Sequence, residues 1–493
     1  MAARVQPPPY KLLPVYALVL LVFGVGTVAV LQLGTRLNAD RQTAVPGEAA
    51  TGAETAPSAQ KAAPAPRGIG EILRENLRHP LSVLLLQVVV ILLAARGGGA
   101  LFHRAGQPTV VGEMVAGILL GPSLLGMVSP GAVSFLFPPA SLETLRLLSQ
   151  AGIILFMFTV GMELNFQHLR RQAHAAVLVS HASIVVPFFL GAAFSLVLYR
   201  SYAPGHVSFT AFGLFMAVAM SITAFPVLAR VISERGLSKS HLGSTAIACA
   251  AVDDATAWCL LAVVVTLARA EGLGGALLTI TLALVFTGAM LFLLKPAAER
   301  LFRGVSGAET WGKGAVAAVL AFVFLSALLT EVIGIHALFG AFLAGVVMPP
   351  SPALRSFLTR QLEPLTTAFL LPLFFAFTGL RTQVGLLDDW ASWLMCAGVV
   401  AIAVAGKLGG SAAAARWTGM SGRDSLALGA LMNTRGLMEL IVLNIGYDMG
   451  ILSPTVFSMM ILMALITTFM TGPFLSLLGV EKPGESPAEG AHQ

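Results

Sequence analysis

Ala251-Val252-Asp253-Asp254-Ala255-Thr256 places two adjacent acids near the middle of residues 242–268, a stretch with no other charged residue. About 20 apolar residues cross the hydrocarbon core of a bilayer as a helix. An ionisable side chain near mid-bilayer costs on the order of 2.5–3.5 kcal/mol on insertion scales, so such residues are usually functional. Consecutive helical residues point about 100° apart, so the two carboxylates cannot line one face. We therefore predict a membrane helix with functional acids, the alternative being acids that only satisfy polar groups between helices.

Composition outside this stretch also excludes whole classes of protein. The chain has 493 residues, of which 11% are charged and 56% hydrophobic, and its mean hydropathy is +0.84. Soluble domains carry roughly 25% charged residues. A cytosolic enzyme, a nucleic-acid-binding protein and a disordered protein are thereby excluded. The net charge of +6 indicates Lys and Arg in cytoplasmic loops, with no nucleic-acid partner.

Apolar stretches long enough to span a bilayer recur along the chain. We expect an all-α integral membrane protein with one N-terminal helix and thirteen core spans. The initial span is expected at 12–34, and the core spans at 80–95, 107–126, 145–164, 174–199, 208–232, 242–268, 272–294, 313–330, 333–350, 364–382, 389–415, 425–447 and 452–478.

The sequence divides into four parts. Residues 1–35 are a membrane anchor or a signal segment, and the uncharged run of 24 residues from Leu12 to Thr35 favours a retained anchor. Residues 36–78 are rich in Ala and Pro without apolar periodicity, which predicts a flexible external linker. Residues 79–480 form the transmembrane domain, and 481–493 a short cytoplasmic tail.

Lys and Arg in the loops set the orientation. With the N-terminus inside, the cytoplasmic side of the core carries sixteen basic residues and the other side four. Both termini are then cytoplasmic, and the chain is multi-pass. The Ala-, Gly- and Arg-rich usage suggests a bacterial inner (plasma) membrane.

Three other spans hold polar groups where a membrane helix rarely has them. Lys407, surrounded by small residues, either snorkels to the cytoplasmic edge or pairs with one of the aspartates. Arg435 and Glu439 are four residues apart around Gly436, and we expect them to compensate the ends of an interrupted helix. The first interruption is expected at Ser221 to Pro226, where the proline removes a backbone donor, although a simple kink would also fit.

The two interruptions lie seven spans apart, at core spans five and twelve. Seven is odd, so the two spans run in opposite directions. This arrangement is typical of inverted-topology repeats whose broken helices cross near the middle of the membrane. We predict spans one to six as one repeat and eight to thirteen as the other.

Six stretches in this order resemble the monovalent cation:proton antiporter family of the second type, which includes bacterial sodium/proton and potassium/proton antiporters and plant cation/proton exchangers. They are Gly112 to Ser123, Ser221 to Pro226, Asp253-Asp254, His336 to Gly345, Leu371 to Phe375, and Asn433 to Glu439. The resemblance covers residues 80–480.

The resemblance implies a role for each site residue. Asp254 is expected to be the carboxylate that binds either a proton or the metal cation, Na⁺ or K⁺. Asp253 is expected to be its partner, paired with Lys407. Thr223, with Ser221 and Pro226 beside it, matches the first crossing point, and Asn433, Thr434, Arg435 and Glu439 match the second.

The function expected is secondary active antiport of a monovalent cation for protons by alternating access. The alternative is a sodium-coupled organic-solute symporter of the same crossed-helix architecture. We expect no enzyme activity, no catalytic residues and no cofactor; the partners are Na⁺ or K⁺, H⁺, the lipid bilayer and, by family analogy, a second copy in a homodimer with spans one, two, eight and nine as scaffold.

Overall fold

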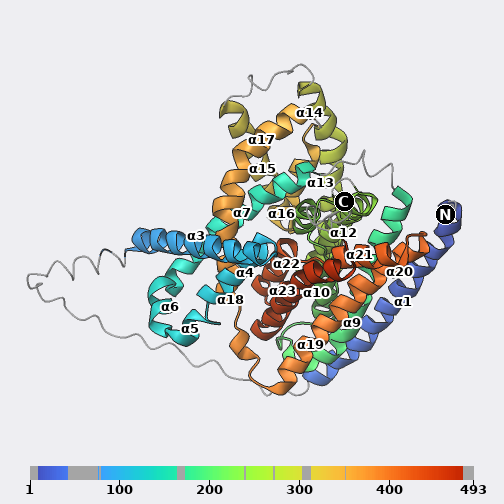
Figure 1. Ribbon diagram of the computed structural model, residues 1–493, viewed down its shortest axis with the longest axis horizontal. Helices are drawn as coiled ribbons and strands as arrows, with labels where there is room; N and C mark the ends of the chain where they lie inside the picture. The colour runs from blue at the N-terminus through green and yellow to red at the C-terminus, as the bar shows by residue number, and fades with distance from the viewer. Residues whose placement is uncertain are drawn as a thin grey trace, which may run out of the picture.

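The computed structural model describes residues 9–42, 76, 79–163, 173–237, 240–269, 273–302, 313–349 and 351–480. Within these ranges the regular structure is entirely helical (Figure 1). Twelve helices are long and apolar enough to cross a membrane, and a bent pair makes a thirteenth span. The chain is therefore a multi-pass membrane protein, and the predicted all-α class is confirmed.

The helices follow the predicted spans closely. Ahead of the second half of the chain lie α1 (Pro9–Gln42), α3 (Pro80–Arg104), α4 (Thr109–Leu120), α5 (Leu125–Val128), α6 (Pro130–Leu136), α7 (Pro139–Glu163), α9 (Ala173–Tyr202), α10 (Phe209–Ser221), α11 (Phe225–Glu234) and α12 (His241–Arg269). After them come α13 (Leu273–Gly288), η2 (Ala289–Leu294), α14 (Lys295–Phe302), α15 (Lys313–Ile333), α16 (Ala337–Val347), α17 (Pro352–Leu365), η4 (Thr366–Leu370), α18 (Leu371–Arg381), η5 (Val384–Leu386), α19 (Trp390–Val404), η6 (Ala405–Gly409), α20 (Gly410–Trp417), α21 (Gly422–Met432), α22 (Leu437–Asp448) and α23 (Pro454–Leu477).

One predicted span is shorter than expected. Residues 333–350 contain only α16, an apolar helix of 11 residues. At 1.5 Å per residue it is roughly 16 Å long, about half the hydrocarbon thickness. Gly334, at φ +96°, ends α15, and His336 caps α16 through Nδ1, which accepts from the Leu338 N–H. The sequence remains apolar across this turn, which is why hydropathy alone overestimated the span.

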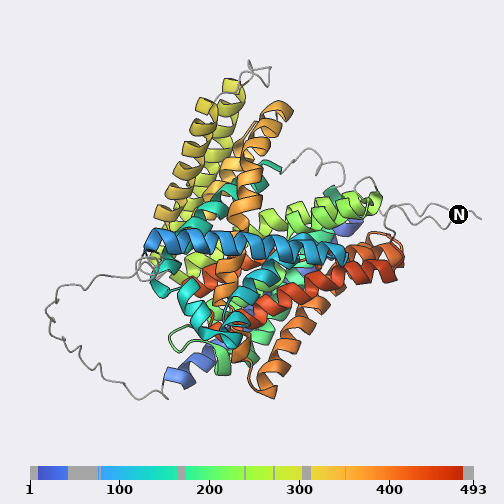
Figure 2. The same cartoon turned by 60° about the vertical axis from the view of Figure 1, so that its left-hand side comes forward.

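Close backbone approaches hold one set of helices together. A Cβ on Gly117 of α4 would lie 2.5 Å from the Phe375 carbonyl oxygen of α18, and one on Gly161 of α7 would lie 2.1 Å from the Phe342 carbonyl oxygen of α16. Small residues allow such contacts between membrane helices. Around α12, in contrast, pack α9, α10, α11 and α21, so the two acids lie inside this second set. Figure 2 shows α13 and α15 extending away from this second set of helices.

Helix α1 lies along α9 and α10 (Figure 1). Phe23 makes an edge contact with Phe189 at 5.5 Å between ring centroids. The helix continues to Gln42, beyond the predicted boundary at residue 35. Most of the predicted linker (43–75, 77 and 78) and the whole tail (481–493) lie outside the described residues. The packing supports the proposal that α1 is a retained anchor.

A substitution at Gly34 tests whether α1 is an integral part of the fold. A Cβ there would lie 2.0 Å from the Phe209 ring, whereas one at Gly24 meets no atom within 4 Å. We expect Gly34→Leu to destabilise the protein by about 1–3 kcal/mol, because added volume in a packed contact forces its neighbours apart. Thermal unfolding in detergent measures this as a lower Tm. Gly24→Leu is the matched control and should leave Tm unchanged; equal Tm values for the two variants would contradict the packing of α1.

Candidate ion-binding site

Two interrupted helices meet at the centre of the second set. The first span breaks at Ile222–Ala224, between α10 and α11, and the other at Asn433–Gly436, between α21 and α22, which are bent by 43°. The Ala224 N–H donates to the Thr434 carbonyl at 3.0 Å, and the Thr223 hydroxyl donates to the Met432 carbonyl at 3.2 Å. Each break thus satisfies backbone groups left free by the other, as buried irregular backbone requires.

Pro226 and Gly436 fit the starts of their helices. Pro226 lies in the first turn of α11, where no intrahelical partner for its missing N–H is needed. It therefore starts a new helix, and the simple-kink alternative does not apply. Gly436 precedes α22 at φ +152°, and a Cβ there would meet Val227 of α11 at 3.0 Å. Glycine is required because L side chains rarely adopt this backbone conformation.

Arg435 and Glu439 lie beside the helix ends that meet at the crossing. The Arg435 guanidinium donates to the Ala219 carbonyl at 2.9 Å and the Met220 carbonyl at 2.6 Å, in the last turn of α10. It also pairs with Glu439, in the first turn of α22. Positive charge at a helix C-terminus and negative charge at an N-terminus are both favourable. Both side chains have 0% exposure, so each cancels the other's charge inside the protein.

Asp253 accepts hydrogen bonds from four side chains on three other segments. The Lys407 ammonium lies 2.7 Å from its Oδ2, and the Thr223 hydroxyl 2.6 Å from the same oxygen. Ser180 donates to Oδ1 at 2.6 Å, and Ser183 donates to Oδ2 at 2.8 Å. Lys407 has 0% exposure, which excludes snorkelling to the cytoplasmic edge. The carboxylate and the ammonium are fully compensated.

The sequence reasoning missed Ser180 and Ser183. They lie three residues apart on α9, so they share a face. Lys407, on the π-helical turn η6, donates to the Ser183 hydroxyl at 3.3 Å. Gly406 beside it packs against Pro187 of α9, where a Cβ would be 2.9 Å from the proline. Two hydroxyls at this spacing in an apolar span were the only signal in the sequence.

Asp254 has no such compensation. It is 1% exposed, and neither carboxylate oxygen makes a hydrogen bond to the described residues. A buried carboxylate without a partner is costly, because ionised groups in low dielectric need a counter-charge. Neutralisation requires a proton or a bound cation.

The remaining predicted residues lie at the crossing without contacting the aspartates. Ser221 donates back to the Ala217 carbonyl of its own helix at 2.6 Å. The Thr434 hydroxyl faces Thr471 of α23 at 3.3 Å. Asn433 is 3% exposed, and its Oδ1 has no hydrogen-bond partner among the described residues. These three therefore support the broken helices.

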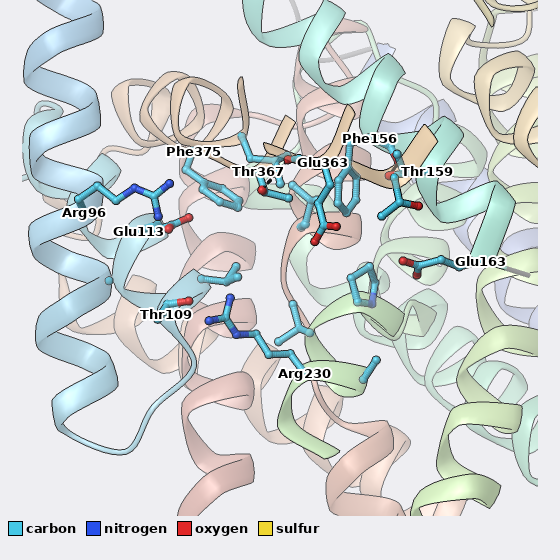
Figure 3. Close-up of a pocket in the computed structure, with 18 of the residues that line it drawn as sticks. Arg96, Thr109, Glu113, Phe156, Thr159, Glu163, Arg230, Glu363, Thr367 and Phe375 are labelled. Atoms are coloured by element: carbon cyan, nitrogen blue, oxygen red, sulfur yellow. Dashed lines mark hydrogen bonds between the residues drawn. The ribbon is translucent and has the colours of Figure 1, made fainter. Parts of the chain in front are cut away.

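Two cavities lie within the helix bundle, and the larger one borders the crossing. The larger, about 540 Å³, is lined by Pro226 and Leu437 of the broken helices and by Phe375. Figure 3 shows Glu163 of α7 and Glu363 of α17 pointing into it, with Arg96 directed towards Glu113. The second cavity has a volume of about 480 Å³, and Phe374 and Ile441 form part of its wall. Its charged and polar lining residues are Arg146, Gln150, Arg269, Glu331, His336 and Asp448.

The walls of the two cavities are neighbouring side chains. Leu437 and Ile441 are one turn apart on α22, and Phe374 and Phe375 are adjacent on α18, with ring centroids 5.9 Å apart. Asp254 is not among the described residues lining either cavity. Among the described residues no group of three or more His, Cys, Asp or Glu could hold a metal ion.

One known protein family and several known proteins match most of this chain. The family described as "Sodium/hydrogen exchanger, transmembrane" matches residues 88–480. The chain is similar to the Na(+)/H(+) antiporter NhaS4 of Synechocystis, with 44% identity over 396 residues, covering 80% of this chain and 97% of the relative. It is also similar to Cation/H(+) antiporter 17 of Arabidopsis thaliana (40% identity, 83% of this chain, 50% of the relative) and to K(+)/H(+) antiporter 1 of Saccharomyces cerevisiae (32%, 84% and 49%).

The chain thus spans nearly all of the cyanobacterial relative and about half of the plant and yeast relatives. Among solved structures, the sodium proton antiporter MjNhaP1 of Methanocaldococcus jannaschii matches with a TM-score of 0.59 at 15% identity, over 82% of this chain and 100% of that one. This likeness concerns the fold. Together with the crossed broken helices, the sequence matches show that the chain belongs to the sodium/hydrogen exchanger family.

Proposed function

We propose that the chain exchanges a monovalent cation, Na⁺ or K⁺, for protons across a bacterial inner membrane, and that both ions use Asp254. The observation that carries this proposal is the buried carboxylate without a hydrogen-bond partner. A carboxylate binds a proton or a hard cation through the same oxygens. Competition for one site gives exchange without a chemical energy source.

Charge accounting supports one-for-one exchange. Among the described residues, five Asp, Glu, Lys and Arg side chains have at most 1% exposure, and four of them form the pairs Asp253–Lys407 and Arg435–Glu439. The fifth, Asp254, leaves one uncancelled negative charge. One proton or one monovalent cation makes this group of five neutral. Only these loaded states avoid the free-energy cost of an isolated buried charge. Without a bound ion, the transporter is therefore hindered from changing the side of the membrane that it faces.

Alternating access requires the carboxylate to face each cavity in turn. The larger cavity is lined by Pro226 and Leu437, which follow the breaks at Ile222–Ala224 and Asn433–Gly436. A shift of the crossing towards either cavity would open Asp254 to one side of the membrane. The Lys and Arg distribution assigns the larger cavity, with Arg96 and Arg230, to the cytoplasm.

The symporter alternative has less support. It needs an organic-solute cavity beside the ion site, whereas Asp254 lines neither large cavity among the described residues. The named relatives are cation/proton antiporters. A transport role without enzyme activity, and a homodimer, remain part of the proposal. The three least buried spans, Leu277–Arg300, Leu18–Thr35 and Pro80–Arg104, offer apolar faces to lipid or to a second copy.

Removing the carboxylate charge tests the site. Asp254→Asn should abolish cation-induced proton movement in proteoliposomes. The amide has no negative charge to bind a cation, and it does not take up or release a proton. Addition of NaCl, KCl, LiCl or choline chloride to vesicles with an imposed pH gradient would identify the transported cation for the unaltered chain. Asp388→Asn, at an exposed acid, is the matched control and should transport normally. Proton movement by folded Asp254→Asn at the unaltered rate would refute the proposal.

Removing the ion pair tests whether it only compensates charge. Lys407→Met leaves Asp253 buried without its cation and should lower the free energy of unfolding by about 3–5 kcal/mol. The double variant Asp253→Asn/Lys407→Met should recover most of this loss, because no charge is then unpaired and the Asn carbonyl still accepts from Ser180 and Ser183.

Thermal unfolding and proteoliposome transport are measured on both variants. The double variant should retain one-for-one exchange, since Asp254 is unchanged. A folded double variant without exchange would show that the pair itself carries a transported proton, as two protons per cation would require.

A further inference from the structure

A third cavity lies at the ends of α3, α11 and α23, and its lining residue Thr468 contacts the crossing through hydrogen bonds with the Arg435 backbone. It has a volume of about 270 Å³ and is lined by residues of three segments: His103, Gly106, Gln107 and Pro108 of the α3–α4 connection, Val231 and Arg235 at the end of α11, and Thr468 and Gly472 of α23. The Lys and Arg distribution assigns this end of α11 to the cytoplasm. None of the roles proposed for ion exchange uses these residues.

Arg235 brings a buried positive charge into this cavity. It is 8% exposed and donates to the Gly472 carbonyl at 2.7 Å and the Ser476 hydroxyl at 3.0 Å. Among the side chains that the structure describes, no carboxylate lies within ion-pair distance of it. Burial lowers the pKa of Arg235, but a guanidinium stays protonated in proteins. A buried cation with only neutral partners favours an anion beside it.

Gln107 supplies a second unsatisfied group. It is 6% exposed, and its Oε1 makes no hydrogen bond to the described residues. The amide can present either its oxygen or its nitrogen to a ligand, because the two are assigned from the hydrogen bonds they make. A Cβ on Gly472 would lie 3.5 Å from both the Gln107 amide nitrogen and the Arg235 Nη2, so the two polar groups share one side of α23.

We propose that this cavity binds a phosphate group, held by Arg235 and Gln107 with His103 at the rim. The planar guanidinium matches two oxygens of a phosphate in a bidentate contact, which a single halide ion does not offer. The cavity is several times the roughly 30 Å³ that a water molecule occupies, so a tetrahedral oxyanion fits. A free phosphate ion and the headgroup of an anionic lipid share this chemistry.

A bound phosphate would join segments that otherwise meet only through side chains here. Arg235 follows α11, the second half of the first broken helix, whereas Gln107 belongs to the α3–α4 connection. The anion would therefore link the cytoplasmic end of the broken helix to the neighbouring helix pair. This inference does not depend on which cation is exchanged.

The test uses the full chain in nanodiscs of neutral phosphatidylcholine. One arm titrates inorganic phosphate against chloride as the reference anion by calorimetry. The other adds phosphatidylglycerol and counts retained lipid by native mass spectrometry. We expect saturable binding in one arm, which identifies the source of the phosphate group.

Gln107→Glu should weaken that binding about tenfold or more, because a carboxylate beside Arg235 supplies the counter-charge itself. It should fold normally, since it adds a partner to a buried cation. Arg235→Lys keeps the charge but loses the planar fork, and should also weaken binding. Arg300→Gln, which removes an exposed charge on α14, is the matched control and should bind as the unaltered chain does. Absence of binding in both arms, or equal binding by Gln107→Glu, would overturn the proposal.

Discussion

An ionised carboxylate inside a membrane protein must be neutralised, and the geometry of the whole centre follows from this requirement. Asp253 meets it permanently, through Lys407 and three hydroxyls. Asp254, the next residue, points elsewhere because the helix turns by about 100° per residue. It finds no partner among the described residues, and we propose that a proton or a cation meets the requirement there. The two aspartates are chemically identical, but their surroundings differ.

The crossing provides those surroundings without leaving helix ends unsatisfied. Arg435 lies against the carbonyls that end α10, Glu439 lies in the first turn of α22, and the two cancel each other's charge. The hydrogen bond from Ala224 to Thr434 ties the breaks to one another. Thr223 links the crossing to the ion pair, since its hydroxyl lies within hydrogen-bond distance of both Asp253 and Lys407. A movement of the crossing would therefore change the hydrogen bonds of Asp253 and Lys407.

Sequence reasoning succeeded where a charge in an apolar stretch left a strong signal. Asp253, Asp254, Lys407, Arg435 and Glu439 were all identifiable because burying them is costly. It was weaker for hydroxyl groups, which bond to their own helix at little cost. Ser180 and Ser183 were missed for that reason, and Ser221 was grouped with the site although it bonds to its own helix. The span at 333–350 was overestimated because apolar composition carries no record of the turn at Gly334.

The most direct test of a single shared carboxylate is the number of protons released per cation bound. It can be measured on the purified chain in neutral-lipid nanodiscs by combining cation calorimetry with pH recording in weak buffer. The account predicts a release that rises towards one proton per cation as the pH is lowered into the range where Asp254 is protonated, and falls towards zero at alkaline pH. A limit of two protons per cation would contradict it, and so would unchanged release from Asp254→Asn.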